Sequence, residues 1–384
     1  DVYKRQTLQW GSADITKDGN KSFGFAGSVA LAIVESDVQS VIDGTSVDGM
    51  AVILEAENNK KIGSGAAGSQ VDSPTGLDIQ VAGSVVINSI SNTTVASVRN
   101  STLTNILDLE IKALATDRIF GLAGTAQVSL APLQGKTVVG VGMSAVWNDT
   151  NNTTNAEIVD CPSIHQNSGD TKVIAEDFTT SIANSFGTQI TVTSGTVVDI
   201  GGMWTANLLF PNTTAQITGS NLTNSNPSTG TAMLVSATLA PILESFAGYF
   251  AIGVSTGGKS AGQLGVGAAV ITTRIGNKKE EPDDPTDNYQ TLAQITGSTI
   301  EAYDSVDVYA LTGDLNDDTD TYVPDQSESD LSDSSKTRYN IRSLAIAGGA
   351  QVGNAPLTAS AQGAFVSTKT RIATIALVTD LSLI

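Results

Sequence analysis

Cysteine and histidine are almost missing from this sequence of 384 residues, which contains one of each, Cys161 and His165. A single cysteine cannot form an internal disulfide bond, and such cysteine usage suits both the cytosol and exported bacterial proteins. A zinc site or a Cys-His catalytic pair would need further ligands or partners of these types, which the chain does not have. We therefore expect structural roles for Cys161 and His165.

Charged and aromatic residues are also scarce, at 15% and 5% of the chain, whereas charged residues usually make up about a quarter of a globular protein. Acidic residues dominate, with a formal net charge of −19 and a pI near 4.2. Binding to nucleic acid or to an anionic membrane surface needs clustered Lys and Arg, so this balance argues against both partners.

Long apolar runs are missing as well. No run of about 20 apolar residues is present, so we expect no transmembrane helix and no direct membrane insertion of this segment. The first six residues, DVYKRQ, lack the apolar core of a secretory signal.

What the sequence does contain is a repeated segment, first seen as FGFAGSVALAIVESDV at Phe23 to Val38. Later copies begin at Leu77, Thr137, Val197 and Gly262. Ser28 and Ser84 lie 56 residues apart, and Ser84 and Ser144 lie 60 apart. About five copies of roughly 60 residues therefore follow one another, which is typical of a repeat array.

Each copy holds four apolar segments with the alternation and the Val, Ile and Thr content of strands. One stretch, AQITGS, recurs unchanged at Ala215 and Ala293. Stacking equivalent segments would bury their apolar faces continuously and would place Val29, Val85 and Val146 in one column. We therefore predict an all-β fold, an elongated parallel β-solenoid or β-helix.

The opening segment has no polar face. One of its alternating sets includes Phe23 and Phe25, and the other is small, as at Ala26 and Ala30. A strand without a polar face is expected to be covered on both sides.

The number of strands per turn stays open in the sequence. The fourth segment of one copy and the first of the next, for example residues 121–131 and 137–147, fit either a hairpin or two faces of one coil. Five copies would rise about 24 Å with one turn per copy and about 48 Å with two.

We expect residues 1–384 to form a single array that is truncated at both ends, since the chain begins inside a copy and a sixth copy starts at Ala361. Two acidic insertions, at residues 278–288 and 313–336, interrupt the fifth copy. Their polar composition predicts loops that project from the stack.

The second insertion contains the sequence DLNDDTD, which places oxygen donors on alternate residues as Ca²⁺ loops do. The candidate ligands are Asp314, Asn316, Asp318 and Asp320. The Gly and Glu of an EF-hand are missing at the required spacing, which excludes that motif. A Ca²⁺ site and a solvated acidic loop both remain open, and we expect no other cofactor.

Three stretches carry a resemblance to a known family: GSVVIN at Gly83 to Asn88, NTTVA at Asn92 to Ala96, and NTTA at Asn212 to Ala215. With the surrounding repeats, they resemble the repeats of very large bacterial filamentous adhesins, the fusobacterial leukotoxin-like adhesins and related autotransporter passengers. The resemblance extends over nearly the whole chain. It implies an exported β-solenoid at the cell surface, of which this chain would be an internal fragment.

A β-helical polysaccharide-acting enzyme or a phage tail protein is the alternative. Glycoside hydrolases need two carboxylates about 5 to 10 Å apart, in a cleft where aromatic rings can hold sugar. Trp147 and Trp204 lie in neighbouring copies and would form either a sugar platform or part of the packing. No recognisable pair is found among the carboxylates Asp108, Glu110, Asp117, Glu157 and Asp160.

We therefore predict a protein that is not an enzyme but an exported bacterial adhesin or autotransporter passenger segment. It would act as a stalk and as a binding surface for a glycan or protein of host or neighbouring cells. It would lie outside the cell, anchored in the outer membrane through regions not in this chain. A structural matrix or surface-layer component is a second alternative, which would self-associate without binding cells.

Overall fold

The computed structural model describes residues 2–16, 21–49, 51–72, 77–131, 137–225, 231–256, 262–276, 289–313, 341–353 and 357–383. Within these residues the regular structure is all β, as the alternating pattern predicts, and no helix is long and apolar enough to cross a membrane. The insertion at 278–288, and that at 313–336 except for Gly313, lie outside the described residues.

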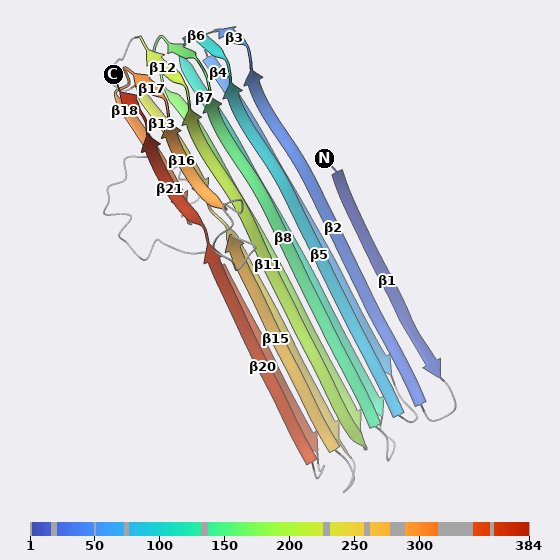
Figure 1. Ribbon diagram of the computed structural model, residues 1–384. Coiled ribbons are helices and arrows are strands. Elements are labelled where there is room, and N and C mark those ends of the chain that lie inside the picture. The colour runs from blue at the N-terminus through green and yellow to red at the C-terminus, as the bar shows by residue number, and fades with distance from the viewer. Residues whose placement is uncertain are drawn as a thin grey trace.

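The chain winds as a coil through three parallel sheets (Figure 1). The first coil runs along β2 (Lys21–Asp43), turns through the short β3 (Ser46–Asp48) and returns along β4 (Ala51–Asp72). The next two coils repeat this course as β5 (Leu77–Arg99), β6 (Thr102–Ile106) and β7 (Asp108–Ala131), then β8 (Thr137–Val159), β9 (Ser163–Gln166) and β10 (Thr171–Thr193).

Later coils divide the long strands. The fourth coil consists of β11 (Thr196–Thr218), β12 (Asn221–Asn224), β13 (Ala232–Leu239) and β14 (Ile242–Ser255). The fifth consists of β15 (Gly262–Gly276), β16 (Gln290–Thr296), β17 (Thr299–Glu301), β18 (Ser305–Thr312) and β19 (Ile341–Gly353). A sixth begins with β20 (Leu357–Arg371), β21 (Ala373–Thr379) and β22 (Ser382–Leu383).

One copy of the repeat is therefore one coil. Consecutive long strands such as β7 and β8 lie in different sheets, so the hairpin interpretation is wrong. We call the sheet of β2, β5, β8, β11, β15 and β20 the first long sheet, that of β4, β7, β10, β14 and β19 the second long sheet, and the short strands the corner sheet. The molecule is longest along its strands, because a strand of 23 residues spans about 75 Å.

Equivalent residues of successive coils lie in register, as the stacked solenoid requires. Ser28 pairs with Ser84 and Ser84 with Ser144, and the two AQITGS stretches pair residue by residue up to Thr218 and Thr296. The first long sheet also has one antiparallel neighbour, β1 (Val2–Thr16), which pairs with β2.

The corner is made by residues with left-handed backbone. Asn100, Asp160 and Gly219 follow the long strands of the first sheet with φ of 48°, 51° and 59°. Gly, Asn and Asp tolerate this conformation better than other residues. Each N–H donates to a carbonyl of the next coil, for example Asn100 to Val159 at 3.1 Å.

The inner faces of the two long sheets form the core, and its composition changes along the strands. We call the part next to the corner sheet the corner end, and the part next to the connections near residues 73–76, 132–136 and 194–195 the loop end. At the corner end the inner residues are apolar, among them Val98, Ile111 and Ile158. Towards the loop end polar columns such as Asn88 and Asn148 alternate with small apolar clusters.

The expectation that the opening strand is covered on both sides is wrong for this chain. Ala26 and Ala30 are buried against the second long sheet, but Phe23 and Phe25 point outward and are 45% and 49% exposed. No described element of the chain lies over this outer face (Figure 1).

Candidate interaction surface

A trough crosses the outer face of the first long sheet at the loop end. Its volume is about 660 Å³, and its lining comes from β2, β5, β8, β11 and β15. The floor is one outward column of Gly27, Gly83, Met143, Gly202 and Ala268, whose register places them side by side in successive coils. The trough therefore runs across the strands. It is recessed because most residues of its floor are Gly or Ala, whereas the neighbouring columns carry larger side chains.

The walls of the trough are apolar. Phe25 stands on one side of the column, and Val29, Val85, Trp204 and Val270 stand on the other. No charged side chain lines the trough. Such a surface suits apolar contact, and it offers few groups that could hydrogen-bond a sugar or polarise a bond.

The two tryptophans that the sequence singles out do meet at this surface. The rings of Trp147 and Trp204 have centroids 5.3 Å apart and are inclined by 76°, an edge-to-face arrangement. Trp204 also lines the trough. The two rings pack edge to face and are not stacked in parallel as a ladder.

Cys161 and His165 are not brought together for chemistry. Cys161 is fully buried in the corner. His165 lies on the outer side of β9, where its Nε2 is 2.6 Å from Oγ of Ser225. The interpretation of these two residues as structural is consistent with this placement.

Cys161 takes the place of a serine in a corner column. In the neighbouring coils Ser101 and Ser220 donate their hydroxyls to the carbonyls two residues earlier, at 2.6 and 2.8 Å. The N–H of Cys161 donates to Oγ of Ser220 at 3.0 Å, and its Sγ lies 3.5 Å from the carbonyl oxygen of Val159. Burial raises the pKa of this thiol, which keeps it protonated and unreactive.

Two buried carboxylates, Asp117 and Asp177, lie close together between the long sheets, and the sequence analysis did not connect them. Asn92 donates to both oxygens of Asp117 at 2.8 Å, and Asn152 donates to Asp117 at 2.7 Å and to Asp177 at 3.2 Å. Thr179 donates to Asp177 at 2.6 Å. Asn152 therefore links Asp117 to a second carboxylate, Asp177, which is not among the five carboxylates compared in the sequence.

Burial controls the protonation of this pair. Desolvation raises the pKa of Asp117 to about 6, against the lowering effect of its hydrogen bonds and of Lys60. Desolvation and the neighbouring Asp117 raise the pKa of Asp177 to about 7. Both side chains are fully buried, so no polymer can reach them. The signal that could have found them is their separation of 60 residues, close to the repeat period.

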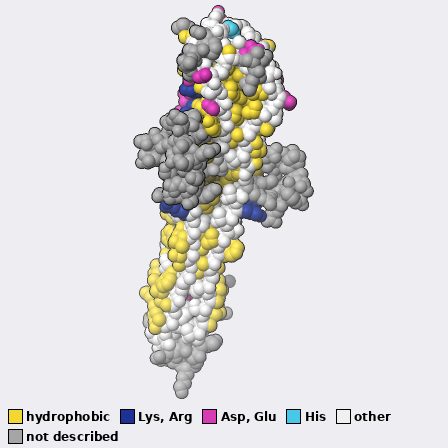
Figure 2. Space-filling model, turned by 90° about the vertical axis from the view of Figure 1, so that its left-hand side faces the viewer, with side chains coloured by type: hydrophobic (Ala, Val, Ile, Leu, Met, Phe, Trp, Pro, Cys, Tyr) yellow, Lys and Arg dark blue, Asp and Glu magenta, His cyan; other side chains and the backbone are white. Residues whose placement is uncertain are grey.

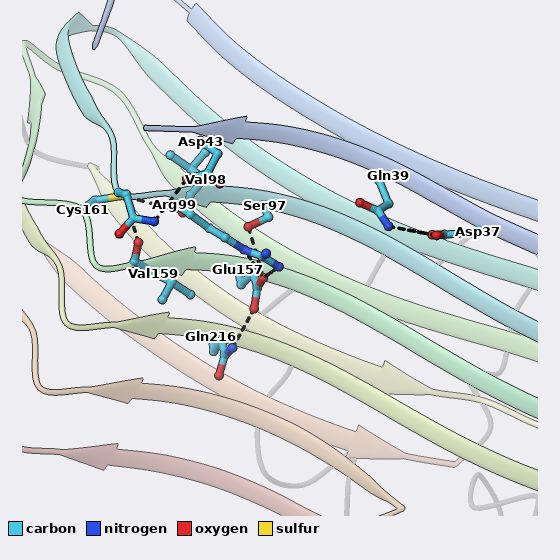
Figure 3. A network of polar contacts seen from close by, with 11 residues as sticks. Asp37, Gln39, Asp43, Ser97, Val98, Arg99, Glu157, Val159, Cys161 and Gln216 are labelled. Atoms are coloured by element: carbon cyan, nitrogen blue, oxygen red, sulfur yellow. Dashed lines mark hydrogen bonds and ion pairs between the residues drawn. The ribbon is translucent and has the colours of Figure 1, made fainter. Parts of the chain in front are cut away.

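A second polar network lies on the outer face of the first long sheet at the corner end (Figure 3). Arg99 forms an ion pair with Glu157, and Ser97 and Gln216 donate to Glu157 at 3.1 and 2.8 Å. Gln294 extends the ladder to Gln216 at 2.7 Å. The network joins four coils, and both carboxylate oxygens of Glu157 accept hydrogen bonds within it. We therefore interpret Glu157 as a structural residue that links neighbouring coils.

The candidate Ca²⁺ ligands Asp314, Asn316, Asp318 and Asp320 lie outside the described residues. Elsewhere, among the residues that the structure does describe, no group of three or more His, Cys, Asp or Glu side chains could hold a metal ion.

Comparison of the chain with protein families, with curated proteins and with solved structures finds no match. The chain is a parallel β-solenoid of repeated long strands, and its function has to be argued from its surface.

Proposed function

We propose that the chain is a segment of an exported bacterial adhesin or autotransporter passenger, which serves as a stalk and as a binding surface. The observation that carries this proposal is the unbroken in-register stacking of one coil on the next. Each added copy lengthens such a stack by about 4.8 Å without a new fold. The continuous backbone pairing also leaves few sites for proteolysis.

The proposed partner is a glycan or protein on a host or neighbouring cell. Two candidate surfaces are proposed for it: the acidic insertions, including the candidate Ca²⁺ ligands, and the trough on the first long sheet. A polysaccharide-acting enzyme has less support, because the trough has aromatic walls but no carboxylate in its lining.

The proposal is tested with the whole chain coupled to beads and presented to a panel of host and bacterial cells. We expect folded chain to retain cells, and soluble chain to compete. Heat-unfolded chain on the same beads is the control. If beads carrying folded and unfolded chain retain the same number of cells across the panel, the adhesin proposal is wrong.

The two candidate surfaces can be separated in the same assay. A variant with Asp314, Asp318 and Asp320 changed to Asn, and wild type in EDTA, test the acidic insertion. If the insertion binds Ca²⁺ and contacts cells, both lower retention, whereas Met143→Lys in the trough leaves it unchanged. Release of shortened oligosaccharides from a glycan panel would instead favour the enzyme.

A further inference from the structure

The outer surface of the first long sheet is apolar over a large, continuous area at the loop end. We call it the apolar face. It consists of the outward residues within 23–31, 79–87, 139–147, 198–206, 264–272 and 359–367, which lie side by side in register. All of these outward residues except Thr272 and Ser367 are apolar or glycine.

Towards the corner sheet, charged residues begin at one column. The first outward column beyond the apolar face contains Asp149, Arg274 and Lys369. None of the outward side chains of the apolar face is charged, so no like charges within it oppose contact between two such faces.

The size of the apolar face exceeds what a monomer normally exposes. Nine residues of strand by six strands is about 30 by 29 Å, or roughly 860 Å². The largest apolar patch on a soluble monomer is about 300 to 600 Å², whereas a stable interface buries about 800 Å² per partner. The apolar face is thus large enough for one interface with one partner.

The apolar face has projecting and recessed positions that are complementary to those of a second copy of the same face. Met143 projects from the floor of the trough and is 56% exposed, while Gly83 and Gly202 beside it leave hollows. A Cβ added at Gly202 would meet nothing within 4 Å, so no packing within the chain requires glycine there. A two-fold axis would place Met143 of each copy in the hollow at Gly202 of the other, the self-complementary arrangement that a two-fold interface requires.

We propose that the apolar face is the interface of a two-fold homodimer, in which the first long sheets of two copies of this chain pack face to face at their loop ends. The outer face of the second long sheet is a poorer candidate, because Asn184 and Thr188 interrupt its apolar residues on the central strand β10. The two polar residues of the apolar face, Thr272 and Ser367, lie at its margin instead.

Lipid chains are fluid and can cover any apolar surface, so a lipid partner would not require a hollow to match each projecting side chain. The match between Met143 and Gly202 therefore favours a second copy of the chain. The inference does not rest on adhesion and goes beyond it.

The test is the mass of the whole chain by sedimentation equilibrium from 0.1 to 100 μM. We expect a dimer for wild type and a monomer for Met143→Lys, with the dissociation constant of the dimer raised at least a hundredfold, about 2.7 kcal/mol. Phe250→Lys is the matched control, because Phe250 is 50% exposed on the second long sheet. It should remain dimeric, and all variants should show the same circular dichroism and thermal unfolding in the monomer range.

A second variant separates an interlocked interface from general stickiness. Gly202→Leu adds apolar area but fills the hollow, and we expect it to weaken the dimer about tenfold. A dimer strengthened by this change would overturn the proposed fit.

Other results would overturn the proposal altogether. These are a wild-type monomer at every concentration, an open-ended series of species that Met143→Lys does not change, or loss of the dimer in Phe250→Lys. Flotation of the monomeric chain with neutral phosphatidylcholine vesicles, lost in Met143→Lys, would show that lipid covers the apolar face instead.

Discussion

The corner end and the loop end use the same coil with opposite distributions of polarity. At the corner end the inner residues are apolar and the outer ones include Arg99, Glu157 and the Lys112 to Glu176 ion pair. At the loop end the inner columns include Asn148, Ser144 and Asp199 and the outer face is apolar. Figure 2 shows this change: hydrophobic side chains fill the middle of the upper part but lie along both sides of the lower part.

The loop end is held together by hydrogen bonds between closely spaced sheets. Ser84 and Ser144 donate to carbonyl oxygens of the facing sheet at 2.9 and 3.0 Å. The sheets approach so closely that a Cβ at Gly68 would stand 2.8 Å from the carbonyl oxygen of Gly83. A parallel stack therefore does not need an apolar core along its whole length. At the loop end its apolar residues can lie on the outer face, where they can form an interface.

The sharpest difference is expected from deleting matched apolar side chains in the two regions. Ile158→Ala at the corner end should lower the free energy of unfolding by about 4 kcal/mol, because it opens a cavity in a large apolar cluster. Ile90→Ala should lower it by about 2 kcal/mol, because Ile90 belongs to a small cluster between polar columns. Urea unfolding at pH 7 measures both. If both variants lost the same free energy of unfolding, apolar burial would contribute equally to stability in the two regions.

The pH dependence of stability tests the buried pair of carboxylates near the junction of the two regions. The pKa values of Asp117 and Asp177 in the folded chain, about 6 and about 7, lie above the ordinary value of 3.8. The folded state therefore binds more protons than the unfolded state, and this stabilisation is complete below pH 3.8 and lost as pH rises through 6 to 7. We expect a loss of about 3 kcal/mol between pH 4 and pH 8.

The double variant Asp117→Asn with Asp177→Asn is the control for this loss. Its unfolding free energy should fall much less over the same range, with a residual slope from Asp199, whose pKa burial raises to about 6. Urea unfolding of both proteins at each pH gives the difference. A slope that is the same in wild type and double variant would rule out the pair as its source.

A smaller effect is expected from the asparagine column of the loop end. Asn148 accepts a hydrogen bond from Asn88 at 2.9 Å and donates to the carbonyl oxygen of Ile182 at 2.9 Å. Asn148→Ala should cost about 2 kcal/mol, because buried polar partners lose their bonds. Asn151→Ala, on the outer side of the same strand, should cost less than about 0.5 kcal/mol. A stabilised Asn148→Val variant would show that the loop end has an ordinary apolar core.

The repeat period was enough to predict the coil, because stacking equivalent segments has one simple solution. The repeat period did not predict the pairing of neighbouring strands to the exact residue. Val29 and Val85 do pair, but the next residue in the column is Ala145, and Val146 lies in the inner column with Val86. A slip of one residue moves a side chain to the other face, and a sequence of small residues specifies such a step weakly.

The candidate site was harder to predict, because it depends on which apolar face is left uncovered. Phe25 and Met143 look like core residues in the sequence, and only the arrangement of the sheets shows that they point outward. The burial of Asp117 and Asp177 beside each other was missed for the opposite reason, since carboxylates in a polar strand pattern are normally exposed. Both errors come from the reversal of polarity at the loop end.

The smallest effect is expected at Cys161, which stands between the hydroxyls of Ser101 and Ser220 in the corner column. Cys161→Ser restores the column, since a hydroxyl can donate to the carbonyl of Val159 as Ser220 does to Thr218. The free energy of unfolding should change by less than about 0.5 kcal/mol, because the thiol already occupies this place. In the native chain the thiol should react with a disulfide reagent only after unfolding, since it is buried and its pKa is raised. Rapid labelling of Cys161 in the folded protein would show that the corner opens, and that the corner end is not the better-packed of the two regions.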